Sequence, residues 1–197
     1  MKQLLGIYVG IFVLMLSFEV QAGALVEPFL GYDQSTLSAK DLSGNDMGAK
    51  NSGLDYGARL GYRLDNGVWF AGEYAAGSGD SKSNVAGTAD STYTRSSMGA
   101  VVGFDHNQFR FWGGYGLSDK LIAKSAAGSE TTFTGSNYKV GVGFKAMPWM
   151  SVNFEYIVPS YTKFDSGSGE ADVSTVFSEF NSTSACLTLS FPIDFGK

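Results

Sequence analysis

Apolar residues alternate with polar or small residues along most of the chain, as in β-strands that have one apolar face. In the stretch from Leu54 to Leu64, the even-numbered residues are apolar or aromatic and the odd-numbered residues are charged or glycine. This period of two predicts eight strands, at 24–32, 54–64, 68–77, 93–104, 109–118, 136–146, 150–160 and 182–192. No stretch with a helical period competes with them, and we expect residues 172–180 to form a loop.

The connections between these stretches alternate between short and long. Tight turns are predicted at Asp65–Gly67, His106–Asn107 and Met147–Trp149. Long polar connections are predicted at 33–53, 78–92, 119–135 and 161–181, rich in Ser, Gly, Asp, Asn and Thr. Because every second connection is long, all four long loops are expected at the same end of an antiparallel, up-and-down sheet.

Two kinds of eight-stranded barrel produce this alternation. A soluble barrel holds its apolar face inside, whereas a transmembrane barrel turns that face outward to lipid. Here the polar face is rich in glycine, which suits a narrow interior and weakens a solvent-exposed strand. Aromatic residues also gather toward the strand ends on the apolar face, where membrane interfaces lie. We therefore predict an all-β transmembrane barrel with short periplasmic turns and four long extracellular loops.

The first residues have the features of an export signal. Lys2 precedes an apolar run from Leu4 to Phe18, and Val20-Gln21-Ala22 resembles a cleavage site. We expect residues 1–22 to be a cleaved signal peptide and residues 23–197 to form the barrel in the bacterial outer membrane. A retained N-terminal anchor helix is the alternative.

Composition narrows the classes of function. The net charge of -5 argues against a nucleic-acid partner. One cysteine and one histidine exclude a disulfide framework and a histidine-rich metal site, so no metal and no cofactor are expected. His106 is assigned to a short turn and Cys186 to the inward face, which leaves no nucleophile and base to assemble. We expect no enzymatic activity; an outer-leaflet lipid-modifying enzyme is the less favoured alternative.

The inward face collects charges that should pair in a low-dielectric interior. Counting residues back from the turn that ends at Gly67 places Arg59 directly opposite Glu73 on the next strand. Counting from the third turn places Gly141 opposite Glu155, with Lys139 diagonally across from Glu155. The second turn sets Arg110 opposite Gly103. The predicted inward charge cluster comprises Glu27, Asp55, Arg59, Arg63, Glu73, Arg95, Arg110, Lys139, Lys145 and Glu155. It is interpreted as a salt-bridged plug; the alternative is an ion path or gate.

Two stretches carry a family resemblance. "VEPFLGY" (Val26–Tyr32) and "PWMSVNFEYIVPSYTKF" (Pro148–Phe164), with its Glu-Tyr pair, resemble strands of the small outer-membrane barrels of the OmpA and OmpX type. The resemblance implies a structural, surface-exposed monomer in the outer-membrane lipid bilayer and lipopolysaccharide, with a closed or narrowly conducting lumen. A small channel for ions or apolar molecules is the alternative function.

The same resemblance implies folding by the barrel-assembly machinery, which reads a C-terminal aromatic residue. The chain departs from the family pattern here, because Phe191 is followed by six more residues. Either Phe191 or Phe195 must serve as the signal.

Overall fold

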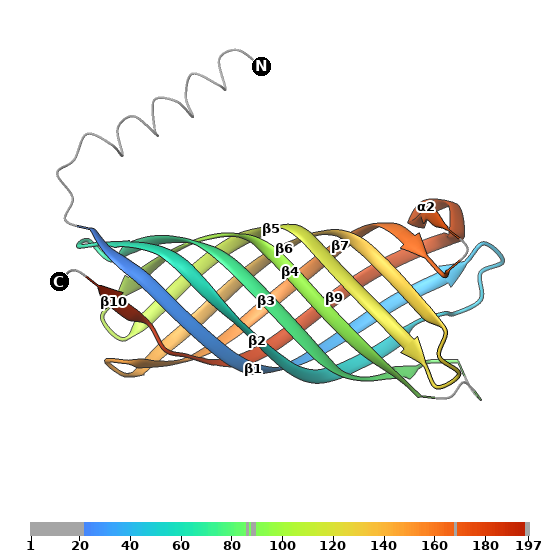
Figure 1. Ribbon diagram of the computed structural model, residues 1–197, viewed down its shortest axis with the longest axis horizontal. Coiled ribbons are helices and arrows are strands. Elements are labelled where there is room, and N and C mark those ends of the chain that lie inside the picture. The colour runs from blue at the N-terminus through green and yellow to red at the C-terminus, as the bar shows by residue number, and fades with distance from the viewer. Residues whose placement is uncertain (1–21, 86, 88–89, 168, 196–197) are drawn as a thin grey trace, which may run out of the picture.

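The computed structural model describes residues 22–85, 87, 90–167 and 169–195, and the predicted signal peptide lies almost wholly outside them. Antiparallel strands follow one another around a closed barrel (Figure 1). The strands are β1 (Ala22–Asp41), β2 (Ala49–Leu64), β3 (Val68–Ser83), β4 (Ser91–His106), β5 (Phe109–Ser125), β6 (Glu130–Met147), β7 (Met150–Asp165), β8 (Glu170–Asp172), β9 (Phe177–Ser190) and β10 (Ile193–Phe195). A single short helix, α2 (Val173–Val176), is described between β8 and β9.

Eight of these strands form the ring, which β9 closes by pairing with both β7 and β1. The pairing of β9 with β1 reaches Ser190, which lies opposite Phe29. After Phe191 and Pro192 the chain resumes the same edge as β10, with Ile193 opposite Val26. Closure satisfies the backbone groups of both edge strands, as a membrane-spanning sheet requires.

The apolar face points outward, which confirms the predicted inside-out arrangement. Tyrosines are exposed toward one end of the apolar band, at Tyr32, Tyr56, Tyr74, Tyr115, Tyr138 and Tyr156. Exposed aromatic residues toward the end with the short turns are Tyr62, Phe70, Phe104, Phe109 and Phe144. Two such belts are typical of the interfaces of an outer-membrane barrel. None of the described helices has the length and apolar character needed to cross a membrane.

The strands are longer than predicted, and the prediction of four long loops is wrong. β1 has 20 residues and β2 has 16, whereas crossing a bilayer takes about 9–11. The connections shrink to residues 42–48, 84–90 and 126–129, and the fourth contains β8 and α2. The prediction of a plain loop at 172–180 is also wrong, because α2 and the start of β9 occupy it.

The reason is a change of polarity along the strands, which is clearest in β1. In β1 the outward residues are apolar up to Tyr32, but Thr36 and Lys40 above it are polar. The inward residues change in the opposite sense, so that Leu37 and Ala39 are buried inside the barrel. At the point where the apolar residues move from the outward to the inward positions, the alternating pattern in the sequence is interrupted. The hydrogen bonds between the strands nevertheless continue beyond that point.

The first short turn forms as predicted, and the second is shifted by one residue. Gly67 has φ 87°, and its amide donates to the carbonyl oxygen of Leu64 at 3.0 Å. In the second turn His106 still pairs with Phe109, which leaves Asn107, with φ 52°, and Gln108 as the turn. The third turn joins Met147 and Met150, which face each other.

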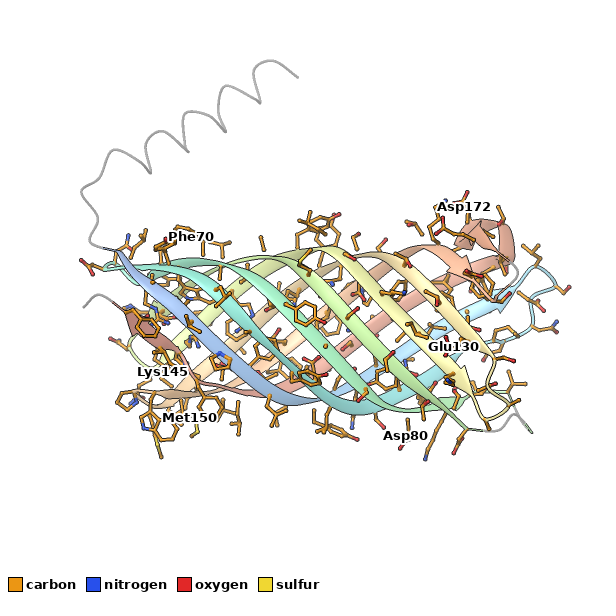
Figure 2. The ribbon with its side chains drawn as sticks, viewed as in Figure 1. Phe70, Asp80, Glu130, Lys145, Met150 and Asp172 are labelled. Atoms are coloured by element: carbon orange, nitrogen blue, oxygen red, sulfur yellow. The ribbon has the colours of Figure 1, made fainter. Side chains whose placement is uncertain are left out.

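The two ends of the barrel differ in character. Phe70, Lys145 and Met150 lie toward the end with the short turns, while Asp80, Glu130 and Asp172 lie toward the other (Figure 2). In outer-membrane barrels the short turns face the periplasm, so the second group marks the extracellular end.

Candidate functional site: ion pairs across the lumen

Six charged side chains from six strands meet inside the membrane-spanning part of the barrel. This central cluster consists of Glu27, Arg59, Glu73, Arg110, Lys139 and Glu155, from β1, β2, β3, β5, β6 and β7. All six were predicted from the inward parity. The side chains of Glu27, Arg59 and Arg110 are 0% exposed.

Arg59 lies at the centre of the cluster and binds three carboxylates. Its Nε donates to Glu73 at 2.8 Å, its Nη1 to Glu27 at 3.2 Å and its Nη2 to Glu155 at 2.7 Å. Both Glu27 and Glu73 lie directly opposite Arg59 on the neighbouring strands, the second as the turn at Gly67 predicts. Glu155 reaches it from the far side of the ring, so the guanidinium spans the lumen.

Arg110 and Lys139 complete the charge balance. The two terminal nitrogens of Arg110 donate to the two oxygens of Glu27, each at 2.7 Å. The ammonium of Lys139 donates to Glu73 and lies 3.7 Å from Glu155. The six residues thus supply three positive and three negative charges. A buried cluster of this kind is tolerated because each charge has opposite partners and hydrogen bonds.

Two tryptophans fill the space between the charges. The rings of Trp69 and Trp112 lie 6.3 Å apart, and the guanidinium carbon of Arg59 sits 4.9 Å from the ring centre of Trp112. Arg110 sits 5.3 Å from the ring of Trp69. Such cation–π contacts add attraction in a desolvated site, and the indoles occupy volume that water would otherwise fill.

The predicted pairing of Arg110 with Gly103 is wrong. Because the second turn is shifted, Arg110 lies opposite Asp105, and Trp112 lies opposite Gly103. Gly103 makes room for an indole rather than a guanidinium, since a methyl group there would overlap the ring of Trp69.

A second group, the periplasmic cluster, lies below the central one and consists of Arg63, Asp105, Lys145 and Asp194. Asp105 lies 3.0 Å from Arg63, 3.1 Å from Arg110 and 3.0 Å from Lys145. It also accepts a hydrogen bond from the indole of Trp69 at 2.8 Å. Sequence analysis missed Asp105 because it ended the fourth strand at residue 104, although the inward parity continues to it.

A third group, the upper cluster, lies toward the extracellular end and consists of Arg95, Asp119, Asn137 and Tyr161. Asp119 accepts hydrogen bonds from Arg95 Nε at 3.0 Å, from the Asn137 amide at 2.7 Å and from the Tyr161 hydroxyl at 3.2 Å. Its carboxylate is fully buried. Sequence analysis missed Asp119 because it placed residue 119 at the start of a long loop, and a bulge after Gly116 also shifts the parity of β5.

The predicted residue Asp55 lies outside the central cluster and accepts a hydrogen bond from the thiol of Cys186, with sulfur and oxygen 3.7 Å apart. A cavity of about 10 Å³ beside it is bordered by Arg95 and Lys139. That volume is about one water molecule. The three clusters therefore join strands across the interior of the barrel through ion pairs and hydrogen bonds.

The outward apolar band and the buried charges define an integral β-barrel protein of the bacterial outer membrane. The chain belongs to the outer membrane protein beta-barrel domain family, whose model matches residues 10–182. No curated protein sequence matches the chain.

Solved structures with a similar fold include two outer-membrane proteins. Ail, the attachment invasion locus protein of Yersinia pestis, in complex with the heparin analogue sucrose octasulfate, has 17% identity and a TM-score of 0.56, with 86% of this chain and 99% of that chain covered. The outer membrane protein AlkL, in DMPC bilayers, has 11% identity and a TM-score of 0.51, with 92% and 95% covered. At such identities the likeness shows the fold alone.

Proposed function

We propose that this protein is a closed, monomeric, non-enzymatic barrel that serves as a structural and surface-exposed component of the outer membrane. The observation that carries the proposal is the complete burial of Glu27, Arg59 and Arg110 in a network that crosses the lumen. An eight-stranded barrel has an interior just wide enough for its own side chains, and here those side chains are bound to one another.

The network has the properties of a plug. Opening an ion path through it would separate Arg59 from three carboxylates and leave buried charges without partners, which is strongly unfavourable. The indoles of Trp112 and Trp69, whose ring centres lie 4.9 and 5.3 Å from the guanidinium carbons of Arg59 and Arg110, narrow the lumen beside them. A steady conductance would need all of these groups to move together.

The positions of His106 and Cys186 support the absence of catalysis. His106 ends β4 at the end with the short turns, and its ring stacks on Phe104 at 6.0 Å. Cys186 is buried inside the barrel at 1% exposure. His106 therefore lies at the end of the barrel away from the outer leaflet, where a lipid-modifying barrel would act, and Cys186 is enclosed in the interior, out of contact with lipid.

A pair of lysines supports lipopolysaccharide as a partner. Lys50 and Lys82 lie directly opposite each other on β2 and β3, both exposed and above the apolar band. Like charges in this position repel, and a phosphate group of the outer leaflet would relieve the repulsion by binding between them.

Planar-bilayer conductance tests the closed lumen. The wild-type barrel is expected to show little steady current, whereas the double variant Arg59→Ala, Glu73→Ala should conduct more because the centre of the plug is gone. Lys50→Ala, which removes a charge from the outer surface, serves as the control and should stay silent. A wild-type barrel that conducts steadily and selects ions by charge would contradict the proposal and support a narrow channel.

A further inference from the structure

The interior of the barrel becomes apolar above the upper cluster. Phe133 is the centre of this region, with the rings of Phe164 and Phe180 at 5.3 and 5.2 Å and that of Phe177 at 6.2 Å. Leu37, Tyr93, Leu121 and Val173 are buried in the same apolar group. The outward residues at this level, such as Thr36 and Lys40, are polar and exposed, so this part of the wall has an inside like that of a soluble barrel.

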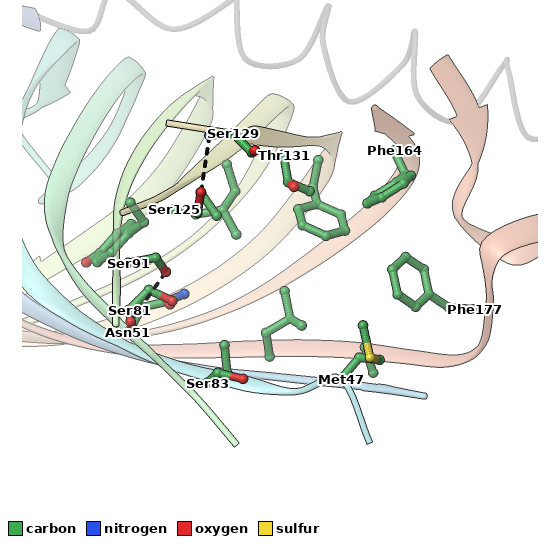
Figure 3. A pocket seen from close by; sticks show the side chains of 17 residues that line it. Met47, Asn51, Ser81, Ser83, Ser91, Ser125, Ser129, Thr131, Phe164 and Phe177 are labelled. Carbon is green, nitrogen blue, oxygen red and sulfur yellow. Dashed lines mark hydrogen bonds between the residues drawn. The ribbon is translucent and has the colours of Figure 1, made fainter. Parts of the chain in front are cut away.

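This apolar region surrounds an open cavity of about 330 Å³, which we call the outer cavity (Figure 3). Leu37, Leu121, Phe133, Phe164 and Phe177 form its apolar wall together with Tyr93. Small hydroxyl residues, among them Ser83, Ser125 and Ser129, also line it. None of the described residues that line it carries a charge. The apolar side chains supply most of the wall, and apolar surface left in contact with water is unfavourable.

We propose that the outer cavity is a binding site for a small, uncharged apolar molecule, with aromatic hydrocarbons of two rings as the best-fitting class. An apolar cavity of about 150 Å³ accommodates a benzene molecule, so the outer cavity has room for roughly twice that. Its volume also lies within the range of small-molecule sites, about 300–1,000 Å³. Three phenylalanine rings that contact one another, Phe133, Phe164 and Phe177, form one side of the cavity and offer the edge and face contacts that aromatic ligands prefer.

The floor of the outer cavity makes it a dead end. Tyr161 packs against Phe133 with ring centres 5.9 Å apart, and its hydroxyl donates to Asp119 of the upper cluster. Asp119 in turn binds Arg95, so a polar, hydrogen-bonded layer separates the apolar region from the central cluster. A ligand held above this layer is retained at the cell surface and does not pass through the lumen. The site is therefore independent of whether the plug conducts.

Methyl NMR of the full barrel in lipid nanodiscs, titrated with naphthalene, tests the site. In the wild type, the methyl signals of Leu37 and Leu121 should shift and saturate. Ala123→Trp should abolish these shifts, because Ala123 lines the cavity and an indole there fills it. Ile122→Trp, one residue away and of outward parity on β5, is the matched control and should leave binding unchanged.

A second pair of variants covers the case in which Ala123→Trp does not fold, which heat-modifiable gel migration reports. Leu121→Asn places an amide in the apolar wall and should weaken binding by about tenfold or more, read at Leu37, because a buried polar group loses its water partners. Ile122→Asn should have no such effect.

Three outcomes would overturn the proposal. One is an unsaturable shift shared with the lipid-facing Leu60, which means partition into the bilayer. Another is naphthalene binding as strong as in the wild type in both the Ala123→Trp and the Leu121→Asn variants. The last is a cavity already filled in the wild type, seen as contacts from lipid acyl chains or from Leu42 to Leu37 with no response to naphthalene.

Discussion

At the scale of single residues, the lumen depends on small residues as much as on charged ones. Gly103 and Gly141 lie where the indoles of Trp69 and Trp112 come closest to the barrel wall. The guanidinium group of Arg59 packs against the ring of Trp112, and that of Arg110 packs against the ring of Trp69. The absence of a side chain at two positions therefore sets the geometry of the charged residues beside them.

Gly103→Ala should destabilise the barrel by about 1–3 kcal/mol, because the added methyl group overlaps Trp69 and overpacks the interior. Urea unfolding and near-UV circular dichroism of the tryptophans report the change. Gly72→Ala is the control: its methyl group would lie 3.9 Å from the nearest atom, the carbonyl oxygen of Leu60, and should be tolerated. Equal stability of the two variants would show that the indole is not held as described.

Arg59→Ala and Glu73→Ala should each destabilise the barrel, by about 3–5 kcal/mol if the remaining charge stays fully buried. Loss of Arg59 removes a hydrogen bond from each of three carboxylates, although Glu27 keeps Arg110 and Glu73 keeps Lys139. Loss of Glu73 removes one hydrogen bond from Arg59 and one from Lys139, so the first variant should be the more affected. The double variant should lose less than the sum of the two, since the residues are in contact. Unfolding free energies of all three variants check this, and strict additivity would contradict a direct ion pair.

At the scale of the element, each long strand is two structures joined end to end. Its lower part carries apolar residues outward, and its upper part carries polar residues outward; in β1, β4, β5 and β6 the upper part also buries apolar residues inside the barrel, such as Leu37, Tyr93 and Leu121. The hydrogen-bonded register runs through the change, as the pairing of β1 with β2 shows from Ala22 to Leu37. A strand is thus a continuous backbone ladder whose two faces meet different solvents along its length.

This division predicts opposite responses to the same substitution on one strand. Leu60→Arg should block stable insertion, because an arginine near the bilayer midplane on the outer surface of a barrel costs about 2–4 kcal/mol. Ser52→Arg, also of outward parity on β2 but beside the polar Lys50, should fold normally. Heat-modifiable gel migration of the membrane fraction separates the two; normal assembly of Leu60→Arg would mean that residue 60 does not face lipid.

At the scale of the whole molecule, closure brings together residues that are remote along the chain. β9 pairs with β1, and β10 continues that edge and carries Asp194, which binds Arg63 at 2.5 Å. The last strand thus completes the sheet and the periplasmic cluster in one step. Both ends of the described chain lie at the end of the short turns (Figure 1).

The orientation of the closed barrel is open to a direct test. A cysteine at Ser43, in the connection between β1 and β2, should react with a membrane-impermeant maleimide added to intact cells. A cysteine at Asn66, in the first short turn, should react only after the outer membrane is permeabilised. Cys186 is buried and serves as the internal blank. The reverse labelling pattern would invert the proposed topology.

The sequence by itself determined which residues face lipid and which face the lumen, because a period of two is a local property of the strand. It also determined the pairing of Arg59 with Glu73, because a three-residue turn with Gly67 in the left-handed region leaves one register. At the second turn the predicted position was one residue too early, so the residue predicted opposite Arg110 was wrong.

Only the tertiary structure decided what the faces enclose. Arg59 and Glu155 are 96 residues apart in the chain, and no turn relates them; closing the ring does. The upper strands escaped prediction because their polarity reverses where the outer surface meets water, and only the assembled wall shows that Leu37, Leu121 and Phe133 share one interior. Local periodicity specifies the face of each side chain, whereas curvature and closure specify its neighbours across the barrel.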